Sequence, residues 1–241
     1  MTKLAYHLSQ NSLKVWQTCQ RKFRYLYIDQ LGFPVSIQGQ EQLVKGKQFH
    51  LILQQQRLGI RVEALVKDDP QLRLWLDNYY NYLPALIAGK EFVEVYRSYQ
   101  MAGVRLLGIY DLLIIGDRQG QIVDWKTHRV PIKSALLHQD WQTKLYLYLL
   151  QVTTNFPPEN LSMTYWFANS PQDSVIINYN QNWHDQIHRE LLEIITEITQ
   201  ETEYPTLYPD SKICQSCEFR YRCFEQSAPL ITVDNIPEIS I

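Results

Sequence analysis

Apolar residues recur at helical spacing along the first third of this 241-residue chain. The pattern predicts a helix that Ser9 or Asn11 caps and that runs to about Tyr27. A second helix is expected from about Gly39 to Leu58, and a third begins at Asp69-Pro70, where proline suits the first helical position. The first part of the chain is therefore expected to contain three helices, with a break at Gly32 and Pro34 and another at Gly59.

Beyond Glu91 the apolar period becomes that of strands. Three runs with short turns between them predict an antiparallel meander, with strands at 92–96, 104–115 and 121–126. The remaining predicted elements are a helix from about 136 to 151, strands at 162–167 and 174–179, and a long helix capped by Asn180. This order predicts an α/β fold with a mixed central sheet flanked by helices.

Two acids interrupt the apolar strands. Side chains alternate along a strand, so Asp124 and Lys126 should point one way and Trp125 the other. Asp111 is the single acid of the preceding strand. A buried carboxylate is costly unless it is paired or binds a metal, so two interpretations stay open: salt bridges at strand ends, or a Mg²⁺ site for phosphate chemistry.

Composition indicates an ordinary globular chain, with 45% hydrophobic and 20% charged residues. The longest apolar run, around Asp111, is too short to span a membrane, and the first ten residues lack a signal-peptide pattern. We therefore expect a cytoplasmic protein with no membrane partner.

The net charge of −2 does not indicate nucleic-acid binding, but the charges are unevenly distributed along the chain. Residues 1–28 contain no acid, and a second basic cluster lies near the C-terminus. Local positive patches can hold a polyanion, and solvated helix faces are the alternative. The basic residues of the two clusters are Lys3, Lys14, Arg21, Lys22, Arg24, Lys212, Arg220 and Arg222.

Three of the four cysteines form a C-x₂-C-x₅-C group, Cys214, Cys217 and Cys223. The fourth, Cys19, lies on the apolar stripe of the first predicted helix and should face inward. Clustered thiols in a cytosolic protein suggest a metal, either Zn²⁺ or an iron–sulfur cluster, and four unrelated buried cysteines are the alternative. A shared site would join the two ends of the chain.

Together these patterns resemble the RecB-like branch of the PD-(D/E)XK nuclease superfamily and are similar to its iron–sulfur-containing CRISPR-associated exonucleases. The motifs occur in the family's order over residues 9–224, and six in sequence are far more specific than any one. They are Ser9-x-x-Ser12-Leu13 leading to Cys19 and Arg21-Lys22-Phe23-x-Tyr25, Gly46-x-x-x-His50, Gly108-x-x-Asp111, Asp124-x-Lys126-Thr127, Gln142-x-x-x-Tyr146, and the C-terminal cysteines.

The resemblance implies a restriction-endonuclease-like core and a role for each matching residue. His50, Asp111, Asp124 and the Trp125 carbonyl would hold Mg²⁺ or Mn²⁺, and Lys126 would act on the attacking water and the phosphate. Glu94 is an accessory candidate. The residues expected to bind DNA are Gln142, Tyr146, Arg21, Lys22, Arg220 and Arg222. The four cysteines would hold a structural [4Fe–4S] cluster, with zinc as the alternative.

The resemblance also implies hydrolysis of DNA, single-stranded or at duplex ends, with CRISPR or recombination proteins as candidate partners. A non-catalytic DNA-binding subunit of a larger complex is the second hypothesis, since the chain has no Walker-type loop.

One domain is expected over 1–241, with a core at about 39–200, cluster-binding elements at 9–28 and 205–225, and a flexible tail at 226–241. The chain departs from the family's pattern at His128, where the resemblance would lead us to expect glycine after Thr127.

Overall fold

The computed structural model describes residues 7–32, 37–127 and 132–224. His128 and the tail 226–241 lie outside the described residues. Two compact units divide the chain: a sheet unit within residues 1–14 and 34–201, and a cysteine unit within 15–33 and 202–241. The two units are described separately below.

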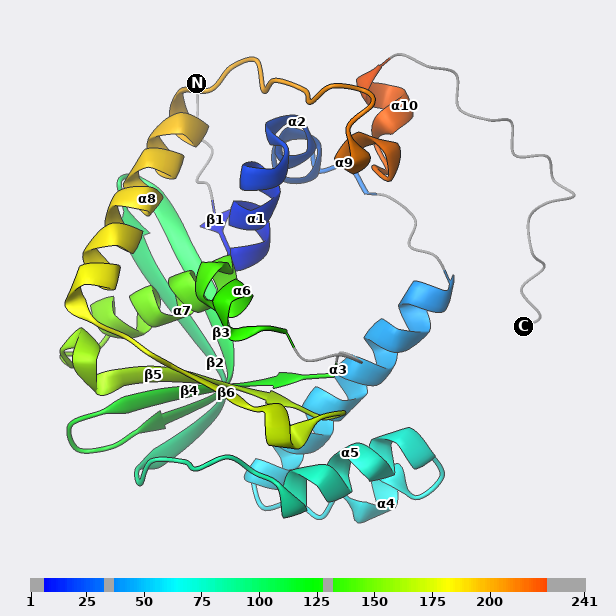
Figure 1. The fold of residues 1–241 in the computed structure, drawn as a ribbon, viewed down its shortest axis with the longest axis vertical. Helices are drawn as coiled ribbons and strands as arrows, with labels where there is room; N and C mark the ends of the chain where they lie inside the picture. Colours follow the sequence, from blue (N-terminus) through cyan, green and yellow to red (C-terminus); the bar gives the residue numbers. More distant parts are fainter. Residues whose placement is uncertain (1–6, 33–36, 128–131, 225–241) are drawn as a thin grey trace, which may run out of the picture. The chain divides into compact units, whose positions relative to one another are not determined.

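The sheet unit contains a six-stranded mixed sheet among its described residues, with strand order β1-β3-β4-β5-β6 and β2 on the other edge of β3 (Figure 1). Antiparallel pairing of β2 with β3 and of β3 with β4 confirms the predicted meander. Strand β4 pairs with β5 in parallel, and β5 with β6 antiparallel. The strands are β1 (His7–Leu8), β2 (Lys90–Met101), β3 (Val104–Ile115), β4 (Gly120–Lys126), β5 (Leu161–Phe167) and β6 (Val175–Asn178).

Helices lie on both faces of this sheet. Asn180 caps α8 as predicted, because its side chain accepts a hydrogen bond from the Trp183 N–H. The third helix begins at Pro70 as predicted, and Asp69 caps it by accepting from the backbone N–H groups of Gln71 and Leu72. The helices of the sheet unit are α3 (Ile37–Arg57), α4 (Glu63–Val66), α5 (Pro70–Asn81), α6 (Ser134–Gln139), α7 (Trp141–Val152) and α8 (Gln181–Gln200), with 3₁₀ turns η2 (Pro158–Asn160) and η3 (Pro171–Asp173).

The chain passes between the units within α1 (Gln10–Thr18). The described cysteine unit is built from short elements, which are α2 (Gln20–Phe23), the π-helical turn η1 (Arg24–Ile28), α9 (Lys212–Gln215) and α10 (Arg220–Cys223).

Alternation in β4 places its side chains as predicted. Val123 and Trp125 join a buried cluster with Phe49 of α3 and Trp75 of α5. Asp124 lies on the other face, where Gln142 of α7 contacts it. The mixed sheet flanked by helices that the sequence predicts is confirmed.

Two helices predicted as continuous are interrupted. The first breaks at Cys19, whose φ of −163° and ψ of 113° are extended, so α1 ends at Thr18. The helix expected over 136–151 is divided at Asp140, which is also extended and caps α7 by accepting from the Gln142 N–H. On α8 the buried residues are Ile187, Leu191, Ile195 and Ile198. Within the described residues, no helix has the length and apolar character needed to cross a membrane.

Candidate active site

A gap along one edge of β3 creates the site. On that edge Leu112 to Ile115 pair with β4, while Arg105 and Leu106 pair with β1. The residues between these pairs have no strand partner on this edge within the described sheet. Side chains therefore satisfy the local backbone donors, and the Trp125 N–H of β4 donates to Asp111 Oδ2 at 2.8 Å. Asp111 thus lies where β3 and β4 separate.

Along β3, the regular alternation of side chains between the two faces of the sheet is interrupted at Asp111. Tyr110 packs on Tyr146 of α7, with ring centroids 5.0 Å apart, whereas Leu112 belongs to the cluster of α3 and α5. Residues two apart in a regular strand share a face, so these two cannot both follow a regular pleat. The partner strand is distorted at the same level, because Glu94 has a φ of 51° and no backbone partner in the ladder. This shared kink aims Asp111 and Glu94 toward α3.

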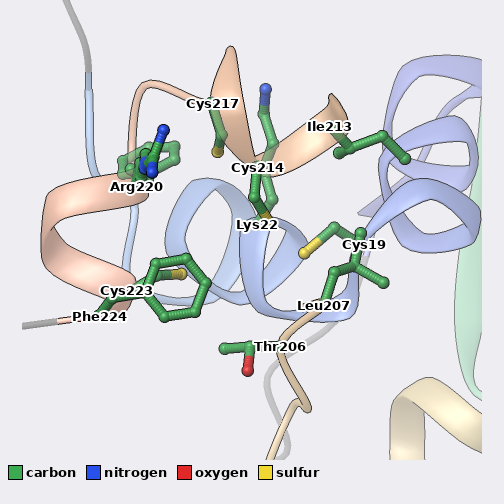
Figure 2. Close-up of a pocket in the computed structure, with 11 residues that line it drawn as sticks. Cys19, Lys22, Thr206, Leu207, Ile213, Cys214, Cys217, Arg220, Cys223 and Phe224 are labelled. Carbon is green, nitrogen blue, oxygen red and sulfur yellow. The ribbon is translucent and has the colours of Figure 1, made fainter. Parts of the chain in front are cut away.

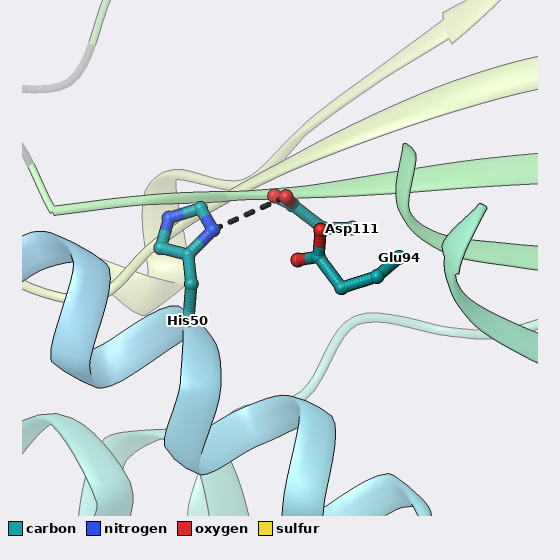
Figure 3. A group of neighbouring side chains, drawn as sticks. All are labelled: His50, Glu94 and Asp111. Atoms are coloured by element: carbon teal, nitrogen blue, oxygen red, sulfur yellow. Dashed lines mark hydrogen bonds and ion pairs between the residues drawn. The ribbon is translucent and has the colours of Figure 1, made fainter. Parts of the chain in front are cut away.

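His50 of α3 meets both acids (Figure 3). Its Nδ1 lies 3.1 Å from Asp111 Oδ1. Ligand atoms of His50, Glu94 and Asp111 all lie within 4.8 Å of one another, which makes this group a candidate metal site. Backbone strain beside such a group is typical of functional sites.

Asp124 and Lys126 form a second, more buried pair beside the first. Lys126 Nζ lies 2.7 Å from Asp124 Oδ2, and Asp124 is only 3% exposed. Gln142 bridges the two: its Oε1 accepts from Lys126 Nζ at 2.7 Å, and its Nε2 donates to Asp124 Oδ1. The amide therefore fixes the ammonium and the carboxylate relative to each other.

The electrostatics of the site favour extra positive charge. Burial raises the pKa of Asp124 to about 6; Lys126 opposes this shift and the negative charge of Asp111 adds to it. Burial lowers the pKa of His50, but the hydrogen bond to Asp111 and the charges of Asp111 and Asp124 outweigh it, so the net shift is upward. Burial, followed by the charge of Asp111, also raises the pKa of Glu94. A cation bound among these groups would relieve the crowding of negative charge.

Two glycines allow close approach at the site. A Cβ on Gly108 would lie 2.9 Å from the Tyr146 ring, so only glycine lets that ring pack directly against β3 at this position. A Cβ on Gly46 would lie 3.1 Å from Thr127 Oγ1, so the glycine lets the Thr127 side chain approach α3 closely.

Tyr146 and Gln142 occupy supporting positions in this structure. Tyr146 is 3% exposed, and its hydroxyl hydrogen-bonds to Gln142 and to the Ile109 backbone N–H. Burial and the nearby Asp124 and Asp111 raise the pKa of this hydroxyl. Contact of either residue with DNA stays a prediction, whereas their support of Lys126 and Asp124 is an additional role that the sequence pattern did not indicate.

Two hollows flank these residues. A groove of about 1130 Å³ lies between α3 and the β2–β3 hairpin, and His50, Glu94 and Asp111 are among its lining residues. Its other lining residues include Lys45, Lys47 and Ile109, which could not be identified from the sequence because an isolated lysine or isoleucine belongs to no motif. A separate pocket of about 300 Å³ is lined by Lys126, Gln142 and Lys14.

In the cysteine unit, all four cysteines line one small pocket (Figure 2). Cys19 comes from the N-terminal segment and the other three from the C-terminal segment, with Leu207 and Ile213 among the apolar residues between them. The break at Cys19 ends α1 at the pocket. Burial raises the pKa of the Cys217 and Cys223 thiols, so a bound cation would be needed to hold them as thiolates.

Four basic residues of this unit were predicted to bind DNA, and they lie at this pocket or beside Tyr25. Lys22 and Arg220 line it, and Lys22 pairs with Glu218 at 2.8 Å. The Arg222 guanidinium lies 5.5 Å from the centre of the Tyr25 ring. Burial raises the pKa of the Tyr25 hydroxyl, and the charges of Arg21 and Arg222 oppose that increase. These cations could neutralise four thiolates, and their contact with DNA stays a prediction.

Comparison with known proteins agrees with this geometry. The family model of the PD-(D/E)XK nuclease superfamily matches residues 7–224. None of the curated proteins matches the chain significantly. A solved structure from Eubacterium rectale, provisionally named an exonuclease, is 13% identical with a TM-score of 0.53, over 88% of this chain and 87% of that one.

The structure of the protein SSO0001 is 18% identical, with a TM-score of 0.42 over 95% of this chain and 90% of that one. The match that decides the assignment is that of the family model, because it spans both acids, the lysine and all four cysteines. The chain therefore belongs to the PD-(D/E)XK nuclease superfamily.

Proposed function

We propose that this chain is a metal-dependent deoxyribonuclease of the RecB-like branch that degrades single-stranded DNA or DNA ends as an exonuclease. Membership of the superfamily makes it a hydrolase that acts on nucleic acids. One observation carries the finer proposal: Asp111, Asp124 and Lys126 meet where β3 and β4 separate, beside His50. The fold shared with a protein provisionally named an exonuclease supports action from an end.

The donor set fits a hard divalent cation. His50, Asp111 and Asp124, with the Trp125 carbonyl and with Glu94 as an accessory, would hold it. Carboxylate and carbonyl oxygens suit Mg²⁺ or Mn²⁺, and the imidazole shifts the preference toward Mn²⁺. Such an ion supplies charge at a phosphoryl oxygen and lowers the pKa of a bound water.

Lys126 supplies the complementary charge of the chain itself. Its ammonium is fixed by Asp124 and Gln142 and reaches the pocket that Lys14 also lines. A positive group held in advance, where negative charge grows on the phosphate, lowers the barrier without having to reorganise during the reaction. Gln142 maintains that position, because it holds both the ammonium and the carboxylate.

The four cysteines are proposed to hold a structural [4Fe–4S] cluster. Structural zinc sites take their ligands from two short knuckles, whereas here one thiol comes from residue 19 and three from residues 214–223. Lys22 and Arg220 at the pocket would offset the negative charge of a four-thiolate site.

The test is cleavage by protein purified without oxygen. End-labelled single-stranded DNA, blunt duplex, circular single-stranded DNA and RNA would each be incubated with Mg²⁺, with Mn²⁺ and with EDTA. We expect metal-dependent loss of linear single-stranded DNA, with circular DNA and RNA resistant. An Asp124→Ala protein prepared in parallel controls for contaminating nucleases.

Other outcomes assign the chain differently. Cutting of circular DNA would contradict exonuclease action, and cutting of RNA alone would contradict the choice of DNA. Salt-sensitive DNA binding without cleavage in any metal would overturn the proposal in favour of a non-catalytic binding subunit of a larger complex, such as a CRISPR or recombination assembly.

A further inference from the structure

An exposed apolar ledge lies on the β2–β3 hairpin beside the candidate metal group. Gly108 and Tyr110 of β3 face α7, so Ile109 between them points to the opposite side, into the groove that Asp111 also lines. Ile109 is 48% exposed. Its cross-strand partner in β2 is Tyr96, which is 53% exposed.

These two side chains form one surface. Directly opposed residues on antiparallel strands have Cβ atoms about 5 Å apart, so the two side chains are direct neighbours on one face of the sheet. Each nevertheless leaves about half of its area uncovered. An exposed aromatic side chain is what base-stacking platforms use in proteins that bind single strands.

The position of this ledge relative to the acids is fixed by the strand. Ile109 and Asp111 are two residues apart, so their Cα atoms are separated by roughly 7 Å. Across the groove, α3 contributes Lys47 and Lys45, and Lys45 is paired with Asp69 at 2.9 Å. A phosphate backbone running along the groove could thus meet lysine on one wall while a base reaches the ledge on the other.

We infer that Tyr96, supported by Ile109, stacks the base of a nucleotide next to the scissile phosphate and so selects single-stranded nucleic acid. This inference rests on the proposed function for its position in the reaction. Bases inside a duplex are already stacked on each other and present only their edges, so the ledge cannot engage them without melting an end. Tyr96 is therefore a specificity-determining residue, separate from the groups that act on the phosphate.

The experiment measures binding apart from cleavage. A short fluorescein-labelled oligodeoxynucleotide, single-stranded or as a blunt duplex, is titrated by anisotropy with Ca²⁺ in place of Mg²⁺, and the probe is checked for integrity afterwards. Tyr96→Ala should weaken single-strand binding about tenfold, with little change for the duplex. Tyr96→Phe keeps the ring and should bind like the wild type.

Matched controls remove equally exposed side chains elsewhere on the sheet unit. Tyr80 of α5 is 48% exposed and Ile176 of β6 is 53% exposed, and neither lies on the β2–β3 hairpin that contributes Ile109 and Asp111 to the groove. Tyr80→Ala and Ile176→Ala should leave binding unchanged, whereas Ile109→Ala should weaken it less than Tyr96→Ala does. Circular dichroism of each variant verifies that the sheet is intact.

An abasic scan locates the stacked nucleotide. Removing one base at a time should weaken binding by the wild type at one position, and that penalty should vanish in Tyr96→Ala because the base has lost its partner. A penalty that persists in the variant, or equal losses for single strand and duplex, would overturn the inference.

The inference and the proposed function can fail separately. If the wild type cleaves nothing while Tyr96→Ala shows the expected binding pattern, the nuclease proposal fails and the stacking site stands. If the wild type cleaves DNA while Tyr96→Ala binds single strands as tightly as Tyr80→Ala does, the inference alone is wrong.

Discussion

The two groups of chemically active side chains in this protein are held in different ways. In the sheet unit, Asp111, Asp124 and Lys126 sit on or at the end of long strands, and each is bonded to another group of the same unit. In the cysteine unit, the thiols lie on or beside helices of only four residues, and all four cysteines are free. The acids are positioned by contacts within the sheet unit, whereas we propose that the thiols are positioned by the metal that they bind.

The largest expected effect follows from removing a thiol. Cys217→Ala should abolish metal binding in the cysteine unit, because three ligands cannot complete a four-thiolate site, and should expose residues 202–224 to protease. The wild type purified without oxygen should be brown and contain iron. The sheet unit should keep its helical and strand signals in the variant.

Two results would contradict this contrast. Retention of full iron content by Cys217→Ala would show that the cysteines do not form one site. A colourless wild type with stoichiometric zinc would replace the cluster with zinc, although the dependence of the unit on its metal would stand.

A smaller effect concerns the pH dependence of the acids. The pKa of Asp124 is raised to about 6 in the fold from an ordinary value of 3.8, so its ionised form destabilises the metal-free protein at neutral pH. That destabilisation is relieved as the pH falls through 6, because the folded state then takes up the proton first. The full difference corresponds to about 3 kcal/mol.

Urea unfolding in EDTA measures this effect. Between about pH 7.5 and 4.5, the wild type should gain about 2 kcal/mol relative to Asp124→Ala. Saturating Mg²⁺ should flatten the difference, since a bound cation favours the ionised carboxylate. Equal pH slopes for the two proteins would show that Asp124 does not titrate as its burial implies.

An effect of similar size or smaller is expected from the two glycines that allow close approach. Gly108→Ala places a methyl group against the Tyr146 ring and should destabilise the sheet unit by about 1–3 kcal/mol. Gly46→Ala meets only the end of the Thr127 side chain and gains helix propensity, so its net effect should stay within about 1 kcal/mol. Thermal unfolding of both variants separates them, and a larger loss for Gly46→Ala would contradict the packing at β3.

Much of the fold could be predicted from periodicity and caps. The meander, the two faces of β4 and the caps at Asp69 and Asn180 follow from local rules that each segment obeys. The break at Cys19 could not, because the stripe of Trp16 and Phe23 continues across it and neither proline nor glycine marks the position.

The candidate active site could be predicted only in part from the sequence, for a similar reason. Alternation places Asp124 with Lys126, but the interrupted alternation at Asp111 depends on β3 having different neighbours along one edge, which is a property of the assembled sheet. The bridge by Gln142 depends likewise on how α7 packs against β4. Long-range pairing of this kind leaves no mark at the residues concerned.

The hydrolytic centre itself is tested most directly by the single-turnover rate of cleavage of end-labelled single-stranded DNA in Mn²⁺. Asp124→Ala and Lys126→Ala should each lower that rate at least about 100-fold, as loss of a preorganised charge does in other enzymes. Matched removal of exposed charges by Asp117→Ala and Lys67→Ala should leave the rate unchanged. Wild-type rates in Asp124→Ala and Lys126→Ala would contradict a catalytic centre at this separation of β3 and β4.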